Sequence, residues 1–105
     1  MAERGLATQE DATTTPVERS YLEVIAYLEA RRAPVIAAQL ARWMRVRPPT
    51  VTSVVQRLEQ KGLISRSASA IRLTPEGTAI AERIIRRHRM LERFLYDTLQ
   101  VPWHE

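Results

Sequence analysis

The fold of this chain is decided by residues 45–58, which read Arg45-Val46-Arg47-Pro48-Pro49-Thr50-Val51-Thr52-Ser53-Val54-Val55-Gln56-Arg57-Leu58. The two prolines can occupy the first positions of a helix, where a missing backbone N–H costs nothing. Apolar residues at i, i+3, i+4 and i+7 then share one helical face, which carries Val51, Val54, Val55 and Leu58. The opposite face carries Thr50, Thr52, Ser53, Gln56 and Arg57. Short polar side chains beside an arginine suit phosphates and base edges in a DNA major groove, although a surface helix with a solvated polar face shows the same pattern.

The residues on both sides of this segment predict a winged helix-turn-helix. A helix over residues 35–44 precedes the basic turn, and its apolar stripe consists of Ile36, Leu40, Trp43 and Met44. Trp43 is expected to anchor the core or its edge rather than to stack on a base. The helix over residues 48–61 ends at Gly62, which suits the left-handed position after a helix. Strands over residues 63–66 and 70–73, linked by residues 67–69, form the wing, and its arginines, Arg66 and Arg72, are expected to reach phosphates.

A helix is also predicted at the N-terminal side of this unit. The sequence Thr15-Pro16-Val17-Glu18 is a capping box with proline at the first helical position. The helix is expected to run to about residue 31 and to bury a stripe of Val17, Tyr21, Val24, Ile25 and Leu28. Residues 1–14 lack any periodicity and are predicted to be a disordered tail. The winged helix-turn-helix domain is therefore assigned to residues 15–74.

A long helix is predicted over residues 75–99. Thr74-Pro75-Glu76 repeats the helix-start signal, and an early Gly77 is a mild cost that close packing would explain. The apolar side of the helix consists of Ile80, Ile84, Leu91, Leu95 and Leu99. His88 and Glu92 lie four residues apart, so they share a face and can bind one manganese, iron, cobalt or zinc ion, or else form a plain polar pair. The fold class is thus mainly α with a small β-hairpin.

Composition excludes several classes of function. The 105 residues are enough for one domain, and the chain has no cysteine, which excludes disulfides, thiolate zinc sites and cysteine nucleophiles. No apolar run approaches the roughly 20 residues that span a membrane, and residues 1–15 do not resemble a signal peptide. We therefore expect a cytoplasmic protein, and a bacterial one. No nucleophile–base–acid set and no glycine-rich phosphate loop is apparent, so an enzyme is not expected.

The basic residues are concentrated around the predicted helix-turn-helix. The whole chain carries a net charge of +4, but residues 42–93 contain twelve Lys or Arg and four Glu, a net charge of +8. A basic segment centred on a helix-turn-helix is the electrostatic footprint of a nucleic-acid-binding protein. The pattern therefore favours double-stranded DNA as the partner.

The chain resembles the DtxR/MntR family of metal-dependent transcriptional repressors from about residue 16 to its end. Similar stretches are 21–25, 49–52, 55–64 and 73–77, which are partly generic to winged helices, and 87–95, whose block Arg87-His88-Arg89-Met90-Leu91-Glu92-Arg93-Phe94-Leu95 is specific. The resemblance implies a winged helix-turn-helix followed by a helical dimerisation domain, with Mn²⁺ or Fe²⁺ between them and a homodimer on operator DNA. It implies metal ligation by Glu23, His88 and Glu92. It also implies base contacts near Arg47, Pro49 and Ser53 and phosphate contacts from Thr50, Thr52 and Arg57.

Two departures from the family pattern weaken the expected metal site. Ser20 stands where the manganese-sensing branch has an aspartate and the iron-sensing branch a methionine. The chain also ends just before the block with the family's remaining ligands and before the dimerisation domain, so we expect either a fragment of a longer repressor or a short protein without the metal switch. Residues 75–105 are accordingly interpreted as the helix that leads toward that domain. Three donors predict weak metal affinity.

Two other interpretations remain open. A MarR-like regulator, which senses a small molecule or nothing, fits the Leu73-Thr74-Pro75-Glu76-Gly77 step into a long helix equally well and leaves His88 and Glu92 as solvated charges. A winged helix used as a protein-interaction module predicts no salt-dependent DNA binding, and the concentration of basic residues argues against it.

Overall fold

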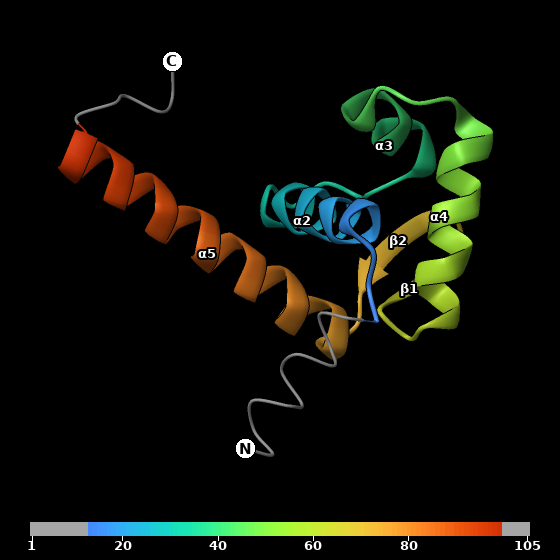
Figure 1. Ribbon diagram of the computed structural model, residues 1–105. Coiled ribbons are helices and arrows are strands. Elements are labelled where there is room, and N and C mark those ends of the chain that lie inside the picture. Colours follow the sequence, from blue (N-terminus) through green and yellow to red (C-terminus); the bar gives the residue numbers. More distant parts are fainter. Residues whose placement is uncertain (1–12, 100–105) are drawn as a thin grey trace.

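The computed structural model describes the backbone of residues 13–99 and the side chains of residues 13–90. Its elements follow the chain in the order α2 (Pro16–Ala30), α3 (Ala37–Met44), α4 (Pro48–Gln60), β1 (Ile64–Ser67), β2 (Ala70–Leu73) and α5 (Pro75–Leu99) (Figure 1). Helix α2 lies at the centre, with α3, α4 and the hairpin on one side, and α5 crosses it and extends away from the other helices (Figure 1). No helix in this described part is both long and apolar enough to cross a membrane.

The predicted capping box begins α2. The Thr15 amide donates to Oε1 of Glu18 at 3.0 Å, and the Glu18 amide donates to Oγ1 of Thr15 at 3.1 Å. The buried face of the helix consists of Glu18, Tyr21, Leu22, Ile25 and Leu28. The prediction that Val17 is buried is wrong, since its side chain is 52% exposed at the margin of this face, and Val24 is only partly buried. The predicted disordered tail, residues 1–14, lies outside the described residues except for Thr13 and Thr14, and Thr14 is buried.

Helix α3 starts two residues later than its periodicity predicts. Val35 is extended and buried, and its carbonyl accepts a hydrogen bond from the Ile71 amide at 2.8 Å, which attaches the chain before α3 to the wing. Ile36 is the extended N-cap and is 40% exposed, and Trp43 is 50% exposed. The predicted apolar stripe is therefore wrong at both positions, because α3 buries only its Leu40 and Ala41 side.

Trp43 lies at the edge of the molecule. Its ring centroid is 5.3 Å from that of Tyr27, at an interplanar angle of 59°, so the indole of α3 packs against the tyrosine ring of α2. Tyr27 in turn accepts a hydrogen bond from the Arg31 guanidinium at 2.8 Å. Of the two predicted positions for Trp43, the core or its edge, the structure shows the edge.

The predicted apolar face of α4 is confirmed. Arg45 adopts the left-handed conformation in the turn, Arg47 is the N-cap, and Pro48 and Pro49 form the first turn of the helix. The face towards the core consists of Val51, Val54, Val55 and Leu58, all buried. Gly62 follows with φ of +75°, as predicted.

The first strand of the wing begins and ends one residue later than predicted. Ser67 pairs with Ala70 inside the hairpin, so the connection is the two-residue turn Ala68-Ser69 rather than residues 67–69. Helix α5 has the predicted bounds, and the Gly77 amide donates to the Thr74 hydroxyl at 3.1 Å at its start. Its first turns bury Ile80, Ala81 and Ile84, while the side chains of residues 91–99 lie outside the described part.

Candidate nucleic-acid interface and metal-ligating pair

The polar residues of α4 form one exposed surface. The side opposite the buried face presents Arg47, Pro49, Thr50, Thr52, Ser53, Gln56 and Arg57, and all seven are exposed. The Thr52 hydroxyl donates to the Pro48 carbonyl at 3.2 Å, within the helix itself. Because the core fixes the other side of α4, this surface is rigidly displayed. The structure thus brings together the seven predicted α4 residues.

Arg57 differs from its neighbours because one end of its guanidinium is held. Its Nε donates to Oε2 of Glu18 at 3.0 Å, while the side chain remains 47% exposed. Glu18 itself is 1% exposed, and its other oxygen accepts from Lys61 Nζ at 2.7 Å. The sequence analysis assigned Glu18 only a capping role and did not identify these partners. The available signal was the pair of cations four residues apart at the end of α4, Arg57 and Lys61, which can share one acceptor.

The pKa of the Glu18 carboxyl follows from these contacts. Burial on its own would raise the pKa, but hydrogen bonds from Lys61, from the Thr15 amide and from Arg57 together lower it below the ordinary value of 4.5. The ionised form of Glu18 is therefore the form that the folded protein stabilises.

We predict an acid-labile contribution from Glu18. Since its pKa is lower in the folded than in the unfolded protein, this stabilisation is complete above pH 4.5 and is lost as the pH falls through the folded-state pKa. Urea unfolding of the wild type and of Glu18→Gln, compared at neutral pH and at a series of pH values below 4.5, should show the wild-type advantage shrinking with acid. A difference between the two proteins that does not change with pH would contradict the prediction.

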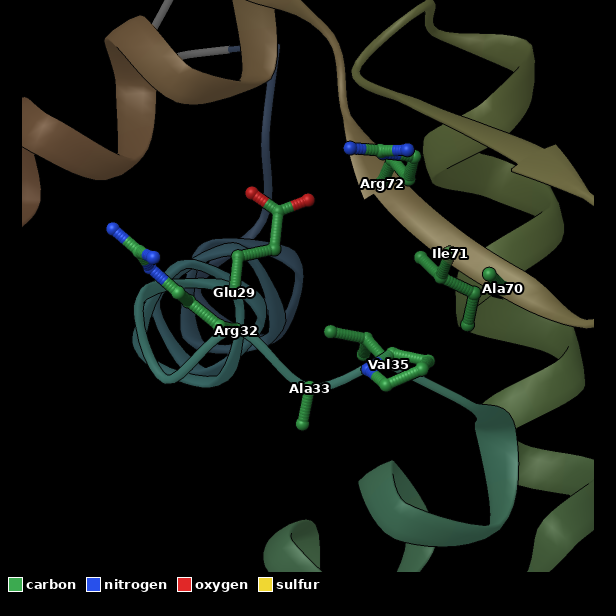
Figure 2. Close-up of a pocket in the computed structure, with 8 residues that line it drawn as sticks. Glu29, Arg32, Ala33, Val35, Ala70, Ile71 and Arg72 are labelled. Carbon is green, nitrogen blue, oxygen red and sulfur yellow. The ribbon is translucent and has the colours of Figure 1, made fainter.

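The two wing arginines lie in different surroundings. Arg66 donates from Nε and Nη2 to Oε1 of Glu59, at 3.2 and 3.1 Å, and both side chains are well exposed. Arg72 lies at the rim of a half-open pocket of about 510 Å³ whose walls include Glu29, Arg32 and Val35. Figure 2 shows Arg72 and Arg32 on either side of the Glu29 carboxylate. Glu29 Oε2 also accepts from the Leu73 amide at 2.9 Å, so it attaches the end of α2 to the wing.

Two of the three predicted metal ligands meet. Nδ1 of His88, on α5, lies 3.0 Å from Oε2 of Glu23, on α2. When the imidazole carries its proton on Nδ1 and donates to this carboxylate, Nε2 keeps the lone pair that binds metals. The Glu92 side chain lies outside the described part, and Ser20 is exposed. Within residues 13–90 no group of three or more His, Asp or Glu side chains converges, so this part supplies an imidazole and a carboxylate, donors suited to Mn²⁺ or Fe²⁺.

Two family models match the chain. A model described as the metal binding and dimerisation domain of iron dependent repressors matches residues 74–105, which include α5. A model of the MarR family matches residues 20–70, which include α3, α4 and most of the wing.

Individual relatives match over most of the chain. The iron-dependent repressor IdeR of Mycobacterium leprae is 35% identical over 86 residues, which are 81% of this chain and 37% of IdeR. The regulator MntR of Lysinibacillus sphaericus is 33% identical over 82 residues, 77% of this chain and 59% of MntR. The crystal structure of T. acidophilum IdeR superposes with a TM-score of 0.75 at 26% identity, covering 86% of this chain and 42% of that one, and confirms the winged helix-turn-helix fold. The chain thus spans between 37% and 59% of these two curated relatives.

Proposed function

This chain belongs to the DtxR/MntR family of metal-dependent transcriptional repressors and corresponds to the N-terminal part of its relatives, and from this premise we propose that it binds double-stranded operator DNA. The family consists of repressors rather than enzymes. The contacts would come from the polar face of α4 in the major groove and from Arg66 and Arg72 of the wing on the phosphates.

The observation that carries this proposal is the division of α4 into two faces. One face is buried in the core, and the other presents seven exposed residues that include Arg47 and Arg57, while the one acid of α4, Glu59, is paired with Arg66. Thr50 and Ser53 are short donors that allow close approach to the duplex, and Gln56 suits a base edge. The net charge of +8 over residues 42–93 supports the same partner.

The test is the affinity for a labelled random-sequence duplex, measured by fluorescence anisotropy over a range of salt concentrations. Backbone-driven binding gives a log–log slope of several units, since each phosphate contact adds about 0.9. Arg57→Ala should reduce the slope by about 0.9, which is the contribution of one phosphate contact. The matched control is Arg31→Ala, which removes the same charge from a residue that is bonded to Tyr27. A slope near zero for the wild type would favour a protein-interaction module instead.

We also predict that releasing Arg66 strengthens DNA binding. Glu59→Gln removes an exposed partner of Arg66 and one negative charge beside the proposed interface. The affinity should rise about two- to fivefold, because an exposed ion pair is worth about 0.4–1 kcal/mol. The same anisotropy assay at fixed salt measures it. An unchanged or weaker affinity would mean that Arg66 does not contact the duplex.

The metal would be held by Glu23, His88 and Glu92, and the operator would be bound by a homodimer. A bound Mn²⁺ or Fe²⁺ would cross-link α2 to α5, where Glu23 and His88 already lie 3.0 Å apart. In a homodimer, two recognition helices would lie about 34 Å apart or a multiple of that distance. Such a switch would work because the metal binds the DNA-competent arrangement more tightly than the other arrangements.

Manganese is expected to change the DNA affinity of this chain only slightly. The described residues supply two donors and Glu92 a third, whereas a tight site for such an ion needs more ligands. The anisotropy titration is repeated with Mn²⁺ added at increasing concentration. A gain of tenfold or more, about 1.4 kcal/mol, would contradict this prediction.

The second candidate function is a MarR-like regulator without metal control, which the MarR match over residues 20–70 favours. It differs from the first in the role of the Glu23–His88 pair. Both residues are replaced together, by Glu23→Gln and His88→Ala. If the protein is a MarR-like regulator, regulation of the native promoter should stay unchanged. If it is a metal-dependent repressor, any response to manganese should be abolished.

A further inference from the structure

We propose that Glu18 is a positioning residue for DNA binding, which holds the Arg57 guanidinium in the orientation that a DNA phosphate requires. This inference rests on the proposed function. It concerns a contact between α2 and α4 that the capping-box pattern did not reveal. The carboxylate lies in the first turn of α2, is 1% exposed, and is surrounded by donors from two elements.

The two cations that share Glu18 have different tasks. Lys61 Nζ donates to Oε1 of Glu18 at 2.7 Å and also to the Thr13 carbonyl at 2.5 Å, so its ammonium is directed at the protein itself. Within the described residues, Arg57 donates only through Nε, to Oε2 of Glu18 at 3.0 Å. A guanidinium has five N–H donors, so the Nη groups of Arg57 remain without a hydrogen-bond partner among the residues whose side chains the structure describes. Lys61 therefore attaches the start of α2 to the end of α4, whereas the Nη groups of Arg57 can donate to another acceptor.

The position of Arg57 favours an anion as that acceptor. The side chain is 47% exposed and belongs to the surface that also presents Ser53 and Gln56. A planar guanidinium that is fixed at Nε has fewer orientations to lose when it binds a phosphate through its other nitrogens. Glu18 thus acts on the duplex through Arg57 rather than by contact.

The sign of the expected effect separates this role from general electrostatics. Removing a negative charge near the interface should by itself strengthen DNA binding, as expected for Glu59→Gln. If Glu18 orients Arg57, Glu18→Gln should instead weaken the binding, although both variants make the same change of charge. The pair Glu18→Gln and Glu59→Gln is therefore a matched comparison.

The experiment is a double-mutant cycle on the full chain, with Glu18→Gln, Arg57→Ala and the double variant, by anisotropy with the labelled duplex at fixed salt. We expect Glu18→Gln to lower the affinity about three- to tenfold when Arg57 is present and to change it by less than about twofold when Arg57 is replaced. Equal losses in both backgrounds would mean that Glu18 acts only through the fold, and no loss would exclude the orienting role. Either result overturns the proposal.

Arg57→Lys keeps the test decisive should Glu18→Gln unfold. A lysine retains the charge but cannot bond Glu18 and a phosphate through one planar group, so we expect an unchanged salt slope with an affinity several-fold lower. Arg57→Ala should instead lower the slope by about one contact. Wild-type affinity in Arg57→Lys would overturn the proposal while DNA binding stood. Loss of salt dependence in the wild type would be a failure of the proposed function itself.

Discussion

Replacing Gly77 with alanine is expected to destabilise the protein by about 3 kcal/mol or more, which is enough to unfold a marginal domain. A Cβ at this position would lie 2.0 Å from the backbone oxygen of Leu63. That oxygen also accepts the Thr74 amide at 3.1 Å, so α5 cannot move away from the wing without breaking a backbone hydrogen bond. The higher helix propensity of alanine, about 1 kcal/mol, does not offset such an overlap.

The measurement is the free energy of unfolding from urea titration, with Gly62→Ala as the matched control. Gly62 has φ of +75° and open space where a Cβ would stand, so the same chemical change meets only left-handed strain, worth about 1 kcal/mol. Gly77→Ala should therefore cost at least twice as much as Gly62→Ala. Equal costs would show that α5 adjusts its position over the wing.

The second large effect is expected at Leu58. Leu58→Ala should cost about 2–5 kcal/mol, because the residue is completely buried and its truncation leaves a cavity in the core under α4. The apparent affinity for DNA should also fall, since the buried face of α4 fixes the position of the exposed face. Under conditions in which both proteins are folded, however, the DNA affinity per folded molecule should change much less than the free energy of unfolding.

Gln60→Ala is the control for this variant. Gln60 belongs to the same helix, is exposed, and is not among the proposed contacts, so its replacement should stay within about 0.5 kcal/mol of the wild type. A small effect of Leu58→Ala, comparable with that of Gln60→Ala, would contradict the assignment of Leu58 to the core.

Helix α2 connects the three elements on which the proposed function depends. Three of its glutamates each bind a different partner: Glu18 binds Arg57 of α4 and Lys61 just after it, Glu23 binds His88 of α5, and Glu29 binds the backbone of β2.

The sequence predicted single elements better than it predicted their faces. The bounds of α5, the proline start of α4 and the left-handed Gly62 followed from residues that act within one turn of the chain. Val17, Ile36 and Trp43 were assigned to buried stripes because apolar residues at helical spacing usually are buried. Their exposure (52%, 40% and 50%) is decided by how the helices pack rather than by the spacing of apolar residues.

By itself, the sequence determined the order of the elements, the buried face of α4 and the concentration of positive charge around it, since these depend on capping, periodicity and composition. The helical spacing made His88 a candidate metal ligand, and the resemblance added Glu23. Only the tertiary structure decided that Nδ1 of His88 lies 3.0 Å from Oε2 of Glu23, and that the capping residue Glu18 is also the buried partner of Arg57 in α4 and of Lys61 just after it. Such contacts join residues 39 to 65 positions apart, and their geometry exists only after the helices have packed.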